Sequence, residues 1–168
     1  MPIAPLPWRG QSASLALCAA ACPALADIGG TVSVQSDGRF RGLSYSNGEP
    51  QVQATLAWDG TGGWYAGALW TQTRFGPQRR SPLWQAYAGR VVPLGVGIDA
   101  EAGLNLSHFS TITRYDYAEA YVGLLGERWN ARLHLSNDYY GSQQRTAYVE
   151  LNLRWPLAPA LSSFAHLG

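Results

Sequence analysis

Residues 145–155 read RTAYVELNLRW, and they alternate between two kinds of side chain without a break. Ala147, Val149, Leu151, Leu153 and Trp155 are apolar, and every residue between them is polar. Successive residues of a β-strand point to opposite faces, so the pattern predicts a strand with one apolar and one polar face. A helix would scatter these apolar residues around its axis. The 11 residues also match the length that a tilted strand needs to cross a bilayer.

The same alternation recurs along the chain and predicts nine strands, the last of them unfinished. Their expected ranges are 30–37, 51–59, 64–74, 83–92, 96–106, 117–125, 128–137, 145–155 and 161–167. The connections between them are longer and shorter strictly in turn. Outer-membrane barrels have this property, with tight periplasmic turns and longer outer loops. The fold class that we predict is therefore all-β, an antiparallel up-and-down transmembrane β-barrel whose first strand runs outward.

Composition agrees with this class. The 168 residues include 19 Gly, 7 Trp and 9 Tyr, and only 14% are charged. Such numbers suit a β-protein rich in turns and interfacial aromatic residues. The formal charge of +1 argues against a nucleic-acid partner. No apolar run of about 18 residues lies beyond the N-terminus, which argues against a helical membrane protein.

The first 26 residues have the features of an export signal. Arg9 supplies a positive start, residues 14–22 an apolar core, and Ala24-Leu25-Ala26 a cleavage site that leaves Asp27 as the first mature residue. We therefore expect residues 1–26 to be a signal peptide that is removed, and 27–168 to be one outer-membrane barrel domain.

Both cysteines, Cys18 and Cys22, lie within the expected signal peptide. The mature chain would then have no disulfide and no cysteine metal site. An alternative is that Cys22 is a lipoprotein processing site, because Ala19-Ala20-Ala21-Cys22 weakly resembles such a box.

Alternation alone does not say which face meets lipid, because a soluble lipocalin-type barrel has the same period with its faces exchanged. The export signal favours the membrane orientation, and so do the aliphatic, alanine-rich apolar faces. Tryptophans near strand ends favour it as well, because aromatic girdles lie at membrane interfaces. These are Trp64, Trp84, Trp129 and Trp155.

With the aliphatic faces outward, the polar residues line the interior. The expected lining residues are Asp99, Glu101, Asn105, Glu119, Tyr121, Arg132, His134, Glu150, Asn152 and Arg154. Four carboxylates against two arginines predict a weak cation preference for small solutes in a hydrated passage. The alternative is that these groups pair across strands and fill a narrow barrel. Residues 64–74 and 83–92 leave the assignment of their faces open.

We expect neither catalysis nor a cofactor. His134 and Ser136 share a face, but two residues along a strand span nearly 7 Å, beyond hydrogen-bond reach. No serine is surrounded by nucleophile-elbow glycines. His108 and His166 lack ligand spacing with any partner, so no metal site is expected.

The outer loops carry more positive than negative charge. Their arginines are Arg39, Arg41, Arg74, Arg79, Arg80, Arg114 and Arg145, against Asp37, Glu49, Asp116 and Asp138. Arginine suits bidentate phosphate contact, so these loops are hypothetical partners of outer-membrane lipid and lipopolysaccharide. The alternative is a solvated loop rim.

Residues 36–53, SDGRFRGLSYSNGEPQVQ, resemble the TorF family of proteobacterial porin-like proteins. The residues that carry the resemblance are Ser36, Asp37, Arg39, Phe40, Arg41, Gly42, Ser44, Ser46, Gly48 and Pro50. The later pieces WYAGALW (64–70), YAEAYVG (117–123) and SNDYYG (136–141) are similar to that family too.

The resemblance implies a barrel in the outer membrane of a Gram-negative bacterium, with a porin function assigned by analogy and no catalytic residues to transfer. It also implies about twelve strands and a terminal aromatic residue read by the barrel-assembly machinery. We therefore expect this chain to be truncated after 8–9 strands. The alternative is that the first strand pairs with the eighth and the last segment is left over. The predicted function is passive diffusion of small solutes. The alternatives are a non-conducting structural or adhesive barrel acting through its loops, and a periplasmic lipocalin-like carrier.

Overall fold

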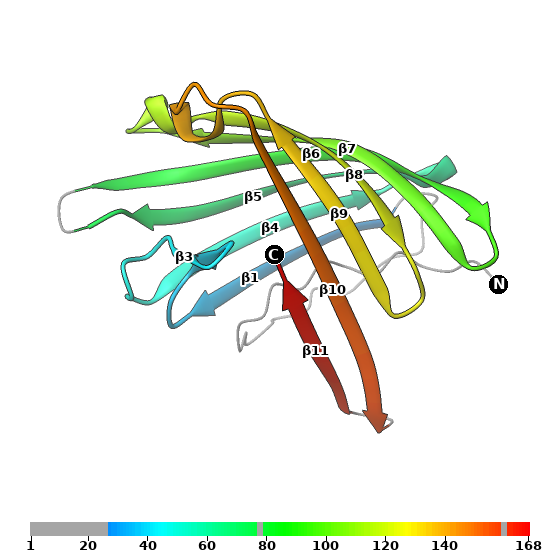
Figure 1. Cartoon of the computed structure of the whole chain (residues 1–168). Helices are drawn as coiled ribbons and strands as arrows, with labels where there is room; N and C mark the ends of the chain where they lie inside the picture. Colours follow the sequence, from blue (N-terminus) through cyan, green and yellow to red (C-terminus); the bar gives the residue numbers. More distant parts are fainter. Residues whose placement is uncertain (1–26, 77–78, 159–160) are drawn as a thin grey trace.

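The structure is a computed structural model that describes residues 27–76, 79–158 and 161–168, and these form one large antiparallel sheet (Figure 1). The nine strands of the sheet are, in order, β1 (Asp27–Gln35), β4 (Gln51–Asp59), β5 (Trp64–Arg74), β6 (Arg80–Gly95), β7 (Ile98–Phe109), β8 (Tyr117–Leu125), β9 (Trp129–Ser136), β10 (Thr146–Ala158) and β11 (Leu161–Leu167). A separate hairpin pairs β2 (Arg39–Phe40) with β3 (Leu43–Ser44). The expected signal peptide, with Cys18, Cys22, Ala24 and Ala26, lies outside the described residues, and Asp27 begins β1.

The all-β prediction is confirmed, and each predicted strand is present. The predicted ends are correct for β4, β5, β8 and β11. Strands β6 and β7 differ from the prediction because the turn between them is tighter than expected. Gly95, Val96 and Gly97 all have positive φ there, so Val96 turns the chain instead of beginning β7.

Neighbouring strands are also neighbours in sequence, so long and short connections alternate between the two ends of the sheet. The end with the longer connections, called the loop end here, carries the β2–β3 hairpin and the 3-10 turns η2 (Thr113–Tyr115) and η3 (Tyr139–Gly141); η1 (Thr61–Gly63) lies at the other end. Within the described residues the sheet is open, because β1 pairs only with β4 and β11 only with β10.

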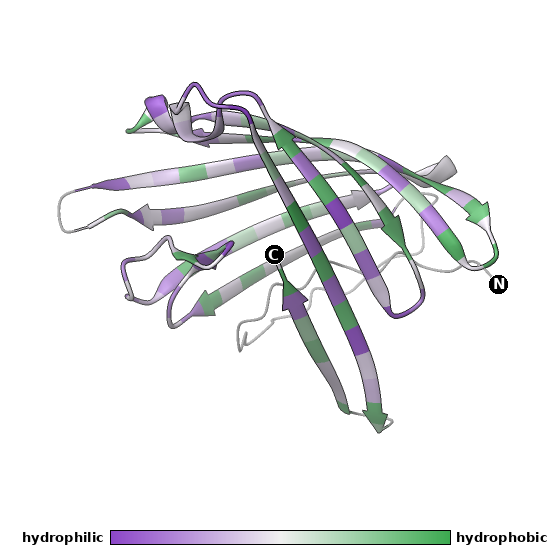
Figure 2. Cartoon of the chain, in the orientation of Figure 1, coloured by the Kyte–Doolittle hydropathy of each residue, from purple (hydrophilic) through white to green (hydrophobic). Residues whose placement is uncertain are grey.

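The two faces of the sheet are unlike each other. One face, called the polar face, carries Glu101, Glu119 and Glu150, which are 5%, 2% and 4% exposed. The opposite, apolar face carries aliphatic residues such as Leu104 and Val149, which are 60% and 63% exposed. The hydropathy colouring alternates accordingly along β9 and β10 (Figure 2). Carboxylates are almost never fully buried unless they are paired, so the burial of these three predicts a partner for each of them.

Tyrosines packed over glycines stabilise the polar face. Tyr65 lies opposite Gly89, and Tyr121 lies opposite Gly103. Gly89 and Gly103 are themselves cross-strand partners, so the two tyrosines lie over the pair and their hydroxyls meet at 2.6 Å. Rings packed over strand glycines in this way rescue positions that have no side chain of their own.

Replacing Gly103 by alanine should therefore destabilise the sheet. A Cβ at Gly103 would lie 2.5 Å from Tyr121 Cζ and 2.6 Å from the Ala88 carbonyl oxygen. We expect Gly103→Ala to lower the free energy of unfolding by about 1–3 kcal/mol, the usual cost of overpacking. Equilibrium denaturant unfolding measures it. Gly30→Ala is the control, because its Cβ would meet no atom closer than 3.5 Å; an equal loss in both variants would contradict the packing argument.

The loop end is filled by an aromatic cluster. Its buried members are Tyr45, Leu83, Phe109 and Tyr117, and Phe40, Phe75, Ile112, Tyr115, Tyr139 and Tyr140 pack around them. Several rings meet edge to face, the geometry that aromatic pairs prefer. The main apolar core of the described chain thus lies at one end of the sheet. No helix among the described residues is long and apolar enough to span a membrane.

Candidate functional site on the polar face

A ladder of charged side chains crosses β7, β9 and β10 on the polar face. The Arg132 guanidinium bonds the Glu101 carboxylate through Nε and, at 3.2 Å, through Nη2. Its Nη1 lies 3.6 Å from Glu150 Oε1. The same Glu150 oxygen lies 3.8 Å from Nε2 of His134. The ladder therefore places one permanent cation between two carboxylates, all of them largely removed from solvent.

Gly123 of β8 makes the Glu101–Arg132 contact possible. It lies between the two residues in register, paired with Glu101 on one side and with Arg132 on the other. A Cβ there would lie 2.7 Å from Glu101 Oε1 and 2.9 Å from Arg132 Cγ. Because glycine leaves that space empty, two charges separated by an intervening strand can pair directly.

Two tyrosines extend the ladder. The Tyr65 hydroxyl donates a hydrogen bond to Glu101 Oε2 at 3.1 Å. It is also hydrogen-bonded to the Tyr121 hydroxyl, as described above. The Tyr121 ring in turn lies 5.5 Å from the imidazole of His134. A continuous polar network therefore runs from β5 to β10.

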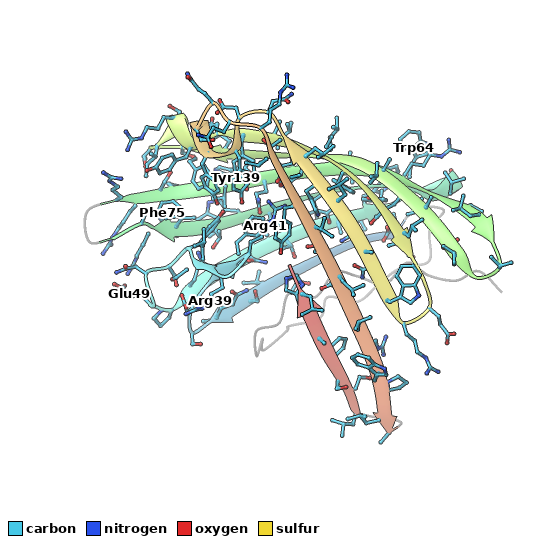
Figure 3. All side chains as sticks on the ribbon, viewed as in Figure 1. Arg39, Arg41, Glu49, Trp64, Phe75 and Tyr139 are labelled. Carbon is cyan, nitrogen blue, oxygen red and sulfur yellow. The ribbon has the colours of Figure 1, made fainter. Side chains whose placement is uncertain are left out.

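The β2–β3 hairpin reaches over the polar face at the loop end. Arg41 and Gly42 form its turn, with φ of 48° and 79°. Positive φ at both central residues is the mark of a type I′ hairpin turn, in which an arginine is unusual. The Arg41 side chain leaves this turn and makes a bidentate pair with Glu119 of β8, at 2.7 and 3.0 Å (Figure 3).

Aromatic groups surround the Arg41 guanidinium. The Tyr139 hydroxyl lies 3.2 Å from Nη1, and the Tyr148 and Phe40 ring centroids lie 4.2 and 4.9 Å from Cζ. Burial alone would lower the pKa of Arg41, but the hydrogen bonds and charge of Glu119 outweigh it and raise that pKa above its ordinary value. Burial also raises the pKa of Tyr139, although Arg41 opposes the shift. This site therefore contains a cation that stays charged beside neutral phenols.

The base of the hairpin explains the residues that resemble the TorF pattern. The Asp37 carboxylate accepts hydrogen bonds from the Ser44 and Ser46 hydroxyls at 2.5 and 2.9 Å and pairs with Arg39. The Ser44 hydrogen bond, followed by those of Ser46 and Arg39, lowers the pKa of Asp37 despite some desolvation. Gly48 has a φ of 73° and donates its amide to Ser44 Oγ. These bonds hold Arg41 toward the polar face; Ser36 and Pro50 make no side-chain hydrogen bond that contributes.

The structure places all ten predicted lining residues on the polar face. Glu101, Glu119, Tyr121, His134 and Glu150 are buried, and Asp99, Asn105, Arg132, Asn152 and Arg154 are half-buried. Register also assigns the faces that the sequence left open. Tyr65, Leu69 and Thr71 of β5 and Gln85 and Tyr87 of β6 lie on the polar face.

Sequence reasoning missed the role of Arg41, which it placed among the outward loop arginines. Arg41 instead lies over the polar face. With Arg41 added, the predicted set holds four carboxylates and three arginines, and its negative surplus falls to one. The unusual arginine in an Arg-Gly hairpin turn was the signal available. Its partner Glu119 lies 78 residues away and carries no sequence mark of the pairing.

The geometry around His134 lacks the contacts of a catalytic pair. Ser136 donates its hydroxyl to the Ala118 carbonyl at 2.7 Å, away from the imidazole. Both His134 ring nitrogens are buried without a hydrogen-bond partner in the structure. In the described ranges, no three His, Cys, Asp or Glu side chains gather as metal ligands would.

The fold and this site together define an antiparallel β-sheet protein with buried carboxylates on one face and exposed aliphatic residues on the other. Residues 19–168 match the family described as "Bacterial protein of unknown function (Gcw_chp)", and the chain belongs to that family. Searches of curated proteins and of solved structures each found no match.

Proposed function

We propose that the protein is an outer-membrane β-barrel that lets small solutes diffuse passively along its polar face. The observation that carries this proposal is the inversion of the two faces, with Glu119 2% exposed and Leu104 60% exposed. An aliphatic face of this extent suits acyl chains as solvent, because large apolar patches are rare on soluble monomers. The same inversion argues against a lipocalin-like carrier, whose apolar face would be enclosed.

The positions of the tryptophans support a bilayer placement. Trp84 and Trp70 are neighbours on the apolar face toward the loop end, with ring centroids 6.4 Å apart. Trp64 begins β5 and Trp129 begins β9 at the opposite end. Two aromatic levels bounding an aliphatic band are the arrangement of membrane barrels. The predicted export signal and the resemblance to the TorF family agree with this location.

The proposal requires the two edges of the sheet to be paired in the bilayer. β1 and β11 each leave one side without a strand partner in the described residues. Unpaired backbone amides and carbonyls cost several kcal/mol each in hydrocarbon, so only closed sheets are stable there. Closure into a barrel is therefore part of the proposed function.

A second candidate function is a non-conducting structural or adhesive barrel, and the loop end favours it. The aromatic cluster and the β2–β3 hairpin occupy that end, and the Arg41–Glu119 pair fastens the hairpin to the sheet. If the hairpin blocks the passage completely, the protein would act only through its outer loops. If it narrows the passage, Arg41 and Glu119 would set its size and ion preference.

Single-channel conductance in planar bilayers distinguishes the two functions. We expect the full-length protein to show small discrete steps with weak cation preference. Glu101→Gln and Glu119→Gln should shift the preference toward anions, because each removes a negative charge from the lining. Arg41→Ala should enlarge the steps, since it removes the hydrogen bonds from the hairpin turn to Glu119 and Tyr139.

Arg145→Ala is the matched control. It removes an exposed loop arginine, and none of the ion pairs in the described residues involves Arg145. Its steps should equal those of the wild type. A protein that inserts and yet carries no current, with or without Arg41, would reject the channel and leave the structural barrel.

A further inference from the structure

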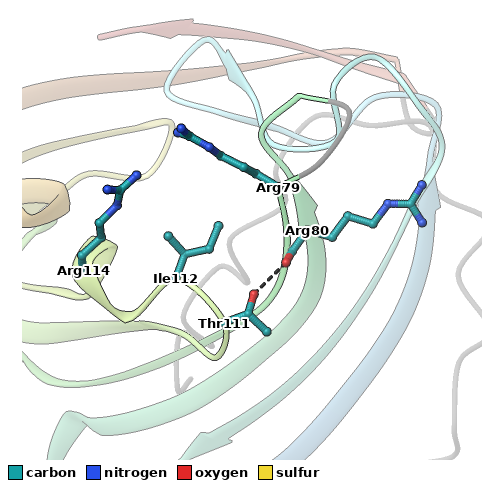
Figure 4. Close-up of a pocket in the computed structure, with 5 residues that line it drawn as sticks. All are labelled: Arg79, Arg80, Thr111, Ile112 and Arg114. Carbon is teal, nitrogen blue, oxygen red and sulfur yellow. Dashed lines mark hydrogen bonds between the residues drawn. The ribbon is translucent and has the colours of Figure 1, made fainter.

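A pocket lies at the loop end, beside the aromatic cluster. It has a volume of about 390 Å³ and is lined by Arg79, Arg80, Thr111, Ile112 and Arg114. In Figure 4, Arg79 and Arg114 extend to the same side of Ile112, whereas Arg80 points the other way. Two guanidiniums therefore lie on one side of the Ile112 side chain in this pocket.

These two guanidiniums converge on one neutral oxygen. Nη1 of Arg79 lies 3.3 Å from the Tyr115 hydroxyl, and Nη2 of Arg114 lies 3.4 Å from it. Both arginines are exposed, and Cζ of Arg114 also lies 5.1 Å from the centroid of the Tyr115 ring. Two like charges therefore meet at one phenol, and their repulsion is reduced by the surrounding water. The hydrogen bond from Arg114 lowers the pKa of Tyr115, as expected for a phenol that serves these cations as an acceptor.

The carboxylates of the loop end are engaged elsewhere. Asp116, the acid nearest in sequence, accepts the Phe109 amide at 2.7 Å and pairs with His108 at 2.6 Å. Asp37 pairs with Arg39, Glu49 pairs with Arg74, and Asp138 accepts the Gln143 amide. No ion pair found in the described chain joins a carboxylate to Arg79 or Arg114.

The walls of the pocket are held together by hydrogen bonds. Thr111 donates its hydroxyl to the Arg80 carbonyl at 2.7 Å and its amide to Ser81 Oγ at 3.1 Å. The Ser110 amide donates to the Pro82 carbonyl at 3.0 Å. The connection that carries Arg114 is therefore fixed against the beginning of β6, next to Arg79. Both arginines therefore extend from backbone that is fixed in place, which lowers the cost of ordering them around an anion.

We propose that Arg79 and Arg114 bind a phosphate group, which takes the place of the Tyr115 hydroxyl between them. Arginine matches tetrahedral phosphate oxygens with paired N–H donors, and such charge-assisted hydrogen bonds are the strong ones. The phosphate belongs either to an anionic lipid headgroup or to a soluble phosphate.

The position of the pocket favours the lipid. Arg79 immediately precedes β6 and lies five residues before Trp84, roughly 17 Å toward the loop end. In the proposed membrane orientation this level is just outside the aromatic girdle, where headgroup phosphates lie. Only this assignment of the source rests on the proposed function; the anion site itself rests on the residues of the pocket.

Phosphorus NMR tests the site on the full-length protein in nonionic sugar-detergent micelles at 0.15 M salt, where long-range attraction is screened. One arm titrates inorganic phosphate; the other adds phosphatidic acid, with phosphatidylcholine as its neutral comparison. We expect saturable broadening of the phosphate resonance in each arm. The double variant Arg79→Gln/Arg114→Gln should weaken binding at least tenfold. Arg128→Gln/Arg145→Gln, which removes the same charge outside the pocket, should leave it unchanged.

The possible outcomes test three things separately: the anion site, the origin of the phosphate that it binds, and the proposed membrane function. Absence of saturable broadening in both arms, or equal binding by the Arg79→Gln/Arg114→Gln variant, overturns the proposal. Binding of inorganic phosphate without any preference for phosphatidic acid supports the anion site and identifies a soluble ligand. Because the micelle arm needs no bilayer, a protein that fails to insert into vesicles but still binds phosphate would refute only the membrane function.

Discussion

Leu104→Arg should prevent stable insertion of the protein into bilayers. Leu104 lies in the middle of β7 on the apolar face, between Ala88 and Ala120, and is 60% exposed. An arginine on the lipid side of a barrel costs roughly 2–4 kcal/mol at the bilayer midplane, which is about 30- to 700-fold in the folding equilibrium. Denaturant titration in lipid vesicles, followed by tryptophan fluorescence, measures this loss.

Asn137→Arg is the matched control for Leu104→Arg, since it adds the same charge at an exposed loop position beyond β9. It should refold like the wild type. If the apolar face instead met water, Leu104→Arg would change the free energy of unfolding by no more than about 0.5 kcal/mol, as exposed substitutions do. That result would invert the assignment of the faces and remove the basis for a membrane function.

Arg132→Met should be the most destabilising single change within the polar network. It keeps an unbranched side chain but leaves Glu101 and Glu150, 5% and 4% exposed, without their shared cation. Removing one partner of a buried ion pair costs about 3–5 kcal/mol, because a desolvated charge is left uncompensated. We expect a loss of that size in denaturant unfolding of the full-length protein.

The double variant Arg132→Met/Glu101→Gln should recover most of that loss. It removes one charge of each sign and leaves Glu150 beside His134, 3.8 Å away. A double variant no more stable than Arg132→Met would contradict the ion-pair explanation. A loss below about 1 kcal/mol in Arg132→Met would mean that water screens the ladder, as it does exposed pairs. The measurement therefore also reports how far water reaches the charged residues of the polar face.

The positions of the strands, and which side chains share a face, could be predicted from the sequence because both depend on the alternation of neighbouring residues. A period of two in residues such as Val149, Glu150 and Leu151 puts alternate side chains on opposite faces whatever the rest of the chain does. The ten residues predicted to line a passage were chosen in this way, and the structure places them together on the polar face. Strands β5 and β6 gave no such answer, because small residues and aromatic residues occur on both of their faces.

Contacts between segments that are distant in the chain could not be predicted from the sequence. The Tyr65 and Tyr121 hydroxyls meet only because the register pairs Gly89 with Gly103 between them. Arg41 looked like one more exposed loop arginine, since nothing near it in sequence indicates Glu119. The aromatic cluster likewise brings together Tyr45 and Tyr140 from two separate connections and Phe109 from the end of β7.

The sequence by itself determined that this protein is an antiparallel β-sheet with one aliphatic and one charged face, because alternation is a property of neighbouring residues. Only the tertiary structure decided which charges meet. Strand register sets which residues lie opposite one another, and the positive φ of Arg41 and Gly42 sets where the hairpin turns. Pairing of Arg132 with Glu101, and of Arg41 with Glu119, follows from that geometry and from the space that Gly123 leaves.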